Sequence, residues 1–232
     1  MNAPAATSIP TANSTADSTA TSTPTSTASR AAGPIRLHRL AASGHCHRVE
    51  LLLSMLGLPY EVIDLDLRRG DQHLPDFLTL NPLAQVPVLE DGDEALPESN
   101  AILVYLATRY APESGWLPRD ASEAAWQERW FSLSVSLLGP GAASPRYRAL
   151  TGQPVDAASQ AIGHRLFALM EAQFARSAFL IADRPTLADL AFYGYTSQAP
   201  IGGVSLETYP QLRSWLARIE ALPGFVPLTD QL

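Results

Sequence analysis

The protein has 232 residues, of which 46% are hydrophobic and 17% charged, and a formal net charge of −7, which is enough chain for one large or two small globular domains. All 16 basic residues are arginine, which excludes chemistry that needs a Schiff-base or phosphate-loop lysine. The arginines form no run longer than two residues and no apolar run approaches the ~20 residues of a membrane span, so we expect neither nucleic acid nor a membrane as partner.

Residues 1–33 consist almost entirely of Ala, Ser, Thr, Pro and Asn. Such a segment cannot bury enough apolar surface to offset its ordering entropy, which predicts a disordered low-complexity tail. It lacks the basic start and apolar middle of a secretory signal and the several arginines of a mitochondrial presequence. The single cysteine, Cys46, has no internal disulfide partner, and together these features favour a cytoplasmic protein.

Residues 34–114 have the pattern of an α/β domain. Residues 34–40 alternate apolar and polar side chains as a half-buried strand does, and a helical apolar spacing then runs to Gly57. Residues 60–67 alternate again, so the unit is strand, helix, strand with parallel pairing. Two short strands over 86–96 and a helix over 98–110 complete the domain.

Every segment from residue 121 to 232 is predicted to be helical, with residues 115–120 as the linker. Strands first and helices afterwards indicate an α/β domain followed by an all-α domain. We expect the helix that starts at Ala121 to break at residues 139–141, Gly-Pro-Gly. The 186–189 stretch fits a capping box at the start of a helix, which is a structural feature.

Four local patterns, in this order and spacing, resemble cytosolic glutathione transferases. They are Ser43 followed by Arg48-Val49; Asn81-Pro82 with Gln85-Val86-Pro87-Val88-Leu89; Glu98-Ser99 with Ala101-Ile102; and Pro185-Thr186-Leu187-Ala188-Asp189. The resemblance covers about residues 34–228 and implies a thioredoxin-like glutathione-binding domain followed by an all-α helical bundle. The first pattern is similar to serine or threonine classes and to bacterial disulfide-reductase-type members.

The resemblance gives Ser43 the role of activating the glutathione thiol. A free thiol with a pKa of ~8.5 is only slightly ionised at neutral pH. A hydroxyl that donates to the sulfur stabilises the thiolate by ~1.5–3 kcal/mol, and a helix N-terminus adds ~0.3–1 kcal/mol. The alternative is that Ser43 only caps the first helix.

His45 and Cys46 are the competing candidates. Residues 43–46 stand where a dithiol oxidoreductase carries Cys-x-x-Cys, but the first position is serine, so a two-thiol relay is excluded. Cys46 would form a mixed disulfide with glutathione if its thiolate is exposed, and otherwise it is a small buried side chain. We expect no metal, because three adjacent residues, His45 to His47, cannot all point at one ion.

The other positions that the resemblance assigns to glutathione lie on three loops. Val86 precedes Pro87, which matches the family's cis-proline, and its backbone would pair with the cysteinyl part of the tripeptide. Glu98 and Ser99 begin a helix, where Ser99 would bind the γ-glutamyl carboxylate and Glu98 the ammonium. The remaining two candidates are Gln72 and Gln85, which would reach the glycine carboxylate and the cysteinyl backbone.

The sequence does not name the second substrate. Four aromatic residues are candidates for its pocket: Trp130, Phe131, Tyr147 and Tyr195. We expect a glutathione S-transferase that joins the thiolate to a small hydrophobic electrophile, as in detoxification. The alternatives are a glutathione-dependent disulfide reductase or peroxidase and a non-catalytic glutathione-binding module. The family resemblance also implies a homodimer.

Overall fold

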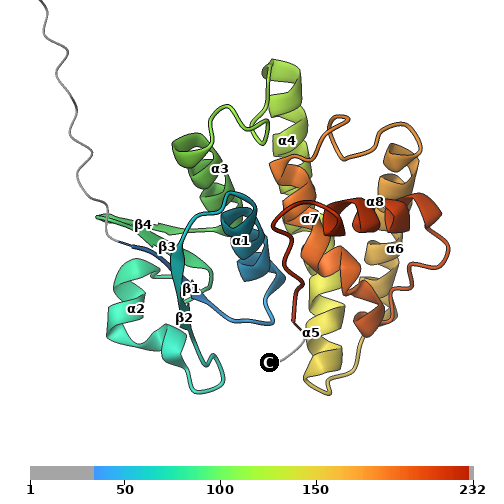
Figure 1. Cartoon of the computed structure of the whole chain (residues 1–232). Coiled ribbons are helices and arrows are strands. Elements are labelled where there is room, and N and C mark those ends of the chain that lie inside the picture. The colour runs from blue at the N-terminus through green and yellow to red at the C-terminus, as the bar shows by residue number, and fades with distance from the viewer. Residues whose placement is uncertain (1–33, 230–232) are drawn as a thin grey trace, which may run out of the picture. The chain divides into compact units, whose positions relative to one another are not determined.

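A mixed four-stranded sheet forms the first half of the computed structural model, which describes residues 34–229 (Figure 1). The predicted tail, 1–33, lies outside the described residues. The strand order is β2-β1-β3-β4, for β1 (Ile35–Arg39), β2 (Tyr60–Asp64), β3 (Val88–Asp91) and β4 (Glu94–Pro97). β1 pairs parallel with β2 and antiparallel with β3, which in turn pairs antiparallel with β4. This is the thioredoxin-like arrangement that the family resemblance implies.

Helices cover both faces of the sheet. On one face lie α1 (Gly44–Met55) and α3 (Ser99–Tyr110), and α2 (Pro75–Leu80) lies on the other (Figure 1). The α2 side is closed by a small apolar cluster that includes Phe77 and Val88. The sequence analysis missed α2, because six residues carry too little periodicity to be recognised.

The second half is helical throughout. It contains α4 (Ala121–Leu133), a π-helical segment η2 (Ser134–Ala143), α5 (Ser144–Leu150), α6 (Ala157–Phe174), α7 (Leu187–Ser197), a short 3-10 turn η3 (Ala199–Gly202) and α8 (Pro210–Glu220). Within residues 34–229, none of the helices is long and apolar enough to cross a bilayer.

The capping box at the start of α7 is confirmed. The Asp189 carboxylate accepts hydrogen bonds from the Thr186 amide (2.8 Å) and hydroxyl (2.7 Å). It also accepts from the Leu180 amide at 3.0 Å and from the Trp215 indole at 2.9 Å. The carboxylate is fully buried, so this network ties the start of α7 to the core of the helical half.

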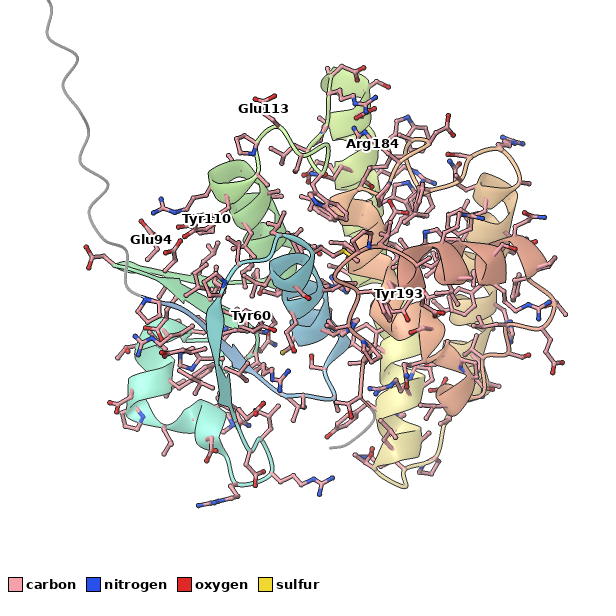
Figure 2. All side chains as sticks on the ribbon, in the orientation of Figure 1. Tyr60, Glu94, Tyr110, Glu113, Arg184 and Tyr193 are labelled. Atoms are coloured by element: carbon pink, nitrogen blue, oxygen red, sulfur yellow. The ribbon has the colours of Figure 1, made fainter. Side chains whose placement is uncertain are left out.

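The segment between α3 and α4 is held by Arg184, which Figure 2 shows beside the start of α4. Its guanidinium donates to the carbonyls of Gly115 and Leu117 and pairs with the Glu123 carboxylate. One side chain of the helical half therefore fixes the connection between the two halves.

The predicted break at residues 139–141 is wrong, because α4, η2 and α5 follow one another without interruption. A π-helix has i→i+5 hydrogen bonds, and it takes up Pro140 within the helical run. Gly141 faces Gly163 of α6, and a Cβ on Gly141 would lie only 2.5 Å from the Gly163 nitrogen. The glycine therefore permits close backbone contact between η2 and α6, and it does not interrupt the helix.

Candidate active site

Ser43 lies where the chain leaves β1 and enters α1. It is the N-cap of α1, and its Oγ accepts a hydrogen bond from the Cys46 amide at 3.4 Å. The first turn of α1 therefore presents free amides and the positive end of the helix dipole next to the serine hydroxyl. An anion bound beside Ser43 would be stabilised by both.

Ser43 opens into a cleft of about 470 Å³ between the two halves of the structure. The thioredoxin-like half contributes the loop around Ser43 and the loop that holds Gln85 and Val86, and the helical half contributes Arg146, Tyr147 and Tyr195 from α5 and α7. Tyr147 is 54% exposed at the cleft, whereas Tyr195 is only 8% exposed. Of the four aromatic residues predicted for the second substrate, the structure places these two at the cleft.

Trp130 and Phe131 do not line this cleft. Both are buried in the helical half, and the Trp130 indole donates to the Leu180 carbonyl at 3.0 Å. Phe131 borders a separate depression beside Val104 of α3. These two predicted pocket residues therefore lie outside the cleft that Ser43 lines, because the packing of α4 turns them toward the core.

A smaller cavity of about 80 Å³ adjoins the cleft and shares His45, Gln85 and Val86 with it. Its other lining residues are Asn81, Pro87, Glu98 and Ser99. The Val86–Pro87 peptide bond is cis, as the resemblance implies. Asn81 shapes this loop, because its side chain donates to the Gln85 carbonyl at 2.8 Å.

Glu98 has a backbone conformation that residues other than glycine rarely adopt. Its φ of 70° lies in the left-handed region, which costs a non-glycine residue about 1–3 kcal/mol. The residue is the N-cap of α3, where the first intrahelical bond runs from the Ile102 amide to the Glu98 carbonyl. Ser99 is the first residue of α3, so its backbone amide comes before the first intrahelical donor and has no acceptor within the helix. Such a helix end is suited to bind a carboxylate.

His45 separates the two cavities. Its ring meets that of Tyr195 edge-on at a centroid distance of 5.1 Å, and its Nδ1 lies 3.4 Å from the Ser99 hydroxyl. Burial, with a smaller effect of the Arg48 charge, lowers the pKa of His45 to about 3. His45 is therefore neutral at pH 7 and acts as a polar wall.

Cys46 is poorly suited to redox chemistry. Its side chain is completely buried, and burial raises the pKa of the thiol to about 12. A thiol in that state is neither ionised at neutral pH nor reachable by a second sulfur. The structure thus gives the mixed-disulfide alternative no support. Among the described residues, the histidine, cysteine, aspartate and glutamate side chains form no group of three suited to hold a metal ion.

Gln72 does not line either cavity. It lies in the 3-10 turn η1 (Asp71–His73), and its side-chain amide donates to the Leu67 carbonyl at 3.4 Å. Leu67 itself lines the cleft, so Gln72 contacts a residue of the cleft wall without lining the cleft. Its amide oxygen is buried and has no hydrogen-bond partner among the described residues.

Arg146 is a cleft residue that the sequence analysis missed. Only 3% of it is exposed, and it donates to the carbonyl of Ala42, directly before Ser43, at 2.8 Å. A second bond reaches the Thr229 carbonyl at 3.1 Å. Arg146 thus joins α5 to the Ser43 loop and to the end of the described chain. One arginine in a helix carries no local signal for such a role.

Comparison with known proteins agrees with this geometry. The model of the glutathione S-transferase N-terminal domain matches residues 35–108, and that of the C-terminal domain matches residues 145–223. Glutathione S-transferase 3 of Zea mays is 33% identical over 203 residues, which cover 83% of this chain and 91% of that protein.

Solved structures give the same result. A glutathione S-transferase from Pseudomonas fluorescens Pf-5 superposes with a TM-score of 0.80 at 32% identity, over 85% of this chain and 100% of that one. A glutathione transferase homologue from Drosophila mojavensis with bound glutathione has a TM-score of 0.73 at 27% identity, over 82% of this chain and 89% of that one.

A thioredoxin-like half with a hydroxyl at its first helix start, followed by an all-α half, defines a glutathione-dependent transferase fold. The chain belongs to the glutathione S-transferase family. It is therefore an enzyme whose co-substrate is glutathione.

Proposed function

We propose that this enzyme transfers the glutathione thiolate to a small hydrophobic electrophile bound in the 470 Å³ cleft. The observation that carries the proposal is the position of Ser43, which caps α1 and at the same time lines that cleft. The hydroxyl contributes ~1.5–3 kcal/mol and the helix end ~0.3–1 kcal/mol toward the thiolate. Together these lower the pKa of a bound thiol by about one to three units.

The smaller cavity holds the rest of the tripeptide in this proposal. Glu98 and Ser99 take the γ-glutamyl end, with the carboxylate at the first turn of α3. The Val86 amide and carbonyl pair with the cysteinyl backbone as an added strand, and Gln85 lies alongside them. The sulfur then points past His45 toward Ser43, because His45, Gln85 and Val86 border both cavities.

Disulfide reduction is the competing activity. It requires either a second glutathione or a protein thiol to receive the mixed disulfide. Since Cys46 is buried with a raised pKa, only the route through a second glutathione fits. The wall of the cleft near Tyr147 offers aromatic surface and therefore favours the hydrophobic electrophile.

The test compares two substrates and four forms of the enzyme. Wild type, Ser43→Ala, Ser43→Thr and Cys46→Ala are assayed with glutathione against a chloro-dinitro aromatic and against hydroxyethyl disulfide. We expect wild type to prefer the aromatic, Ser43→Ala to lose roughly 10- to 100-fold in kcat/KM, and Ser43→Thr to retain most activity because it keeps both the cap and the hydroxyl.

Other results would favour the alternatives. Unchanged rates in Ser43→Ala would remove Ser43 as the activator. Loss of the disulfide rate in Cys46→Ala, with its melting temperature preserved, would assign the chemistry to the cysteine. Binding to immobilised glutathione without turnover of either substrate would indicate a binding module.

The homodimer and the compartment are part of the same proposal. The depression beside α3, α4 and η2 has Val104 and Val135 among its lining residues, next to the polar side chains of Asn100, Glu128 and Ser132, and Val135 is 70% exposed. A second copy packed there would bury this surface, so sedimentation should give twice the monomer mass, and Val135→Glu should give the monomer. The cytoplasm fits the free Cys46 thiol.

A further inference from the structure

We propose that residues 225–229 form a positioning segment for the thiol-activating serine. His47 of α1 anchors one end of this segment, and Arg146 of α5 anchors the other. Arg146 also holds the carbonyl directly before Ser43. The inference rests on the proposed function, in which Ser43 activates the thiol. It assigns part of that activation to a stretch of chain that follows α8 and does not line the cleft.

The 225–229 segment lies between the two halves of the structure. Figure 1 shows this part of the chain descending from α8 between α1 and α5. It begins at Phe225, whose ring meets that of Tyr193 edge-on at a centroid distance of 5.3 Å (Figure 2). Leu228 is only 8% exposed. A Cβ on Gly194 of α7 would lie 3.5 Å from Leu228 Cδ2 and from Gly44 Cα, so α1, α7 and the segment meet at this glycine.

His47 fixes the segment to the first turn of α1. The residue is only 3% exposed, and its Nε2 lies 2.8 Å from the Val226 carbonyl oxygen. A carbonyl oxygen only accepts hydrogen bonds, so Nε2 carries the hydrogen and donates it. The His47 backbone amide donates to the Ser43 carbonyl at 2.9 Å. The residue that binds the segment is therefore also bonded to Ser43.

Arg146 fixes the other end of the segment and transmits its position to the serine loop. Its Nη2 donates to the Thr229 carbonyl at 3.1 Å, and its Nη1 donates to the Ala42 carbonyl at 2.8 Å. A guanidinium is planar and rigid, so the direction of one N–H group fixes the direction of the other. The Thr229 carbonyl therefore aims the donor that holds Ala42, and Ala42 precedes Ser43 in the chain.

These contacts act on the chemical step more than on glutathione binding. Ser43 is held through the carbonyl before it and through its own carbonyl, so release of the segment would let its hydroxyl move relative to the bound sulfur. A displacement of about 1 Å in a catalytic group can cost ~10²-fold in rate. The lining residues of the smaller cavity that bind the rest of the tripeptide, Val86, Glu98 and Ser99, belong to other loops. Glutathione affinity should therefore change little.

The first test removes the donor to Val226 in the full-length enzyme. His47→Phe keeps a ring of similar size. We expect it to lower kcat with the chloro-dinitro aromatic about 3- to 10-fold. The pKa of the bound glutathione thiol, measured by ultraviolet thiolate absorbance, should rise by roughly half a unit to one unit. The dissociation constant for glutathione, measured by calorimetry, should stay within about twofold of wild type, and His47→Gln, which keeps a side-chain N–H donor, should retain most of kcat.

A second variant loosens the segment itself and has a matched control. Leu228→Ser weakens the packing between the two anchors, and it gives an independent measurement if His47→Phe does not fold. Leu206 is also a loop leucine, 9% exposed against 8% for Leu228, and it does not line the cleft. Both Leu228→Ser and Leu206→Ser should lower the melting temperature, because each removes buried apolar surface. Only Leu228→Ser should lower kcat and raise the pKa of the bound thiol, in assays well below both melting temperatures.

A double variant tests the route through Arg146. If the segment acts through this arginine, His47→Phe with Arg146→Met should have the kcat of Arg146→Met alone, and additive losses would overturn the proposal. Wild-type kcat and thiol pKa in His47→Phe and Leu228→Ser, with only the melting temperature lowered, would refute the positioning role and leave that of Ser43 intact. If Ser43→Ala itself leaves the thiol pKa unchanged, the proposed function is refuted, and the inference about the segment with it.

Discussion

Gly141 in the π-helical segment offers a sharp test of how the helical half is assembled. A Cβ at this position would lie 2.5 Å from the backbone nitrogen of Gly163 and 2.8 Å from its Cα. These are backbone atoms of α6 and cannot swing aside, so Gly141→Ala must push η2 and α6 apart. Overpacking of this kind costs about 1–3 kcal/mol.

The expected change in melting temperature follows from that free energy. At about 2–4 °C per kcal/mol for a chain of this size, Gly141→Ala should melt about 2–12 °C below wild type. Thermal unfolding followed by circular dichroism, without glutathione and at one protein concentration, measures the change. Gly163→Ala should behave alike, because its Cβ would meet the Gly141 carbonyl.

Gly139 provides the matched control two residues away. Its Cβ would have ordinary contact only, with the Ser134 carbonyl oxygen at 3.7 Å. Alanine is favoured over glycine inside a helix by about 0.5–1 kcal/mol, so Gly139→Ala should melt at or a few degrees above wild type. A Gly141→Ala protein as stable as Gly139→Ala would refute the conclusion that close backbone contact between η2 and α6 requires glycine.

Three further changes test the buried polar groups. Burial lowers the pKa of His45 to about 3 and that of His47 to about 4, so their contribution to stability is complete above the unfolded value of ~6.5 and is lost as the pH falls. Relative to pH 7.5, each histidine should lower the free energy of unfolding at pH 5 by about 2 kcal/mol, as measured with urea. His45→Gln should show only about half of the wild-type decrease between these two pH values. A variant that loses as much stability as wild type would contradict this. Asp189→Ala should destabilise by about 3 kcal/mol or more in the same assay, since it strands several buried donors, whereas a loss below 1 kcal/mol would argue against the network. Arg146→Met removes the hydrogen bond to the Ala42 carbonyl, so the Ser43 loop should be held less precisely and kcat/KM should fall about tenfold. Unchanged kcat/KM in this variant would contradict the role of Arg146.

Much of the fold was predictable because its signals are local. The strand and helix periods over residues 34–114 identify the α/β half, and the structure has β1, α1 and α3 where the pattern places them. β2 ends at Asp64, earlier than the alternation suggests, because Asp66 organises a turn by accepting the Arg68 amide at 3.0 Å. In the sequence, a polar residue at every second position looks the same whether its side chain accepts a hydrogen bond in a turn or lies on the exposed face of a strand. The alternation alone therefore does not show where β2 ends.

The site was predictable where a motif carries it and not elsewhere. Ser43, Val86, Pro87, Glu98 and Ser99 were found because their spacing resembles a known family, and the structure brings them to two adjoining cavities.

The side chains that the helical half contributes had no comparable signal. Trp130 and Tyr195 are both aromatic residues in apolar helices, and sequence alone gives them equal standing. Only the packing of α4 and α7 decides that one is in the core and the other is at the cleft.

By itself the sequence determined the order of elements, the two halves of different class and the position of the hydroxyl at a helix start, because these depend on neighbours within a few residues. The tertiary structure alone decided that Cys46 is buried, that the Gly-Pro-Gly stretch continues a helix, and that Tyr195 and Arg146 reach the Ser43 loop. The contacts of Arg146 with Ala42 and of Tyr195 with Gly44 each join residues more than a hundred positions apart, and a contact at that separation leaves no periodicity in either segment.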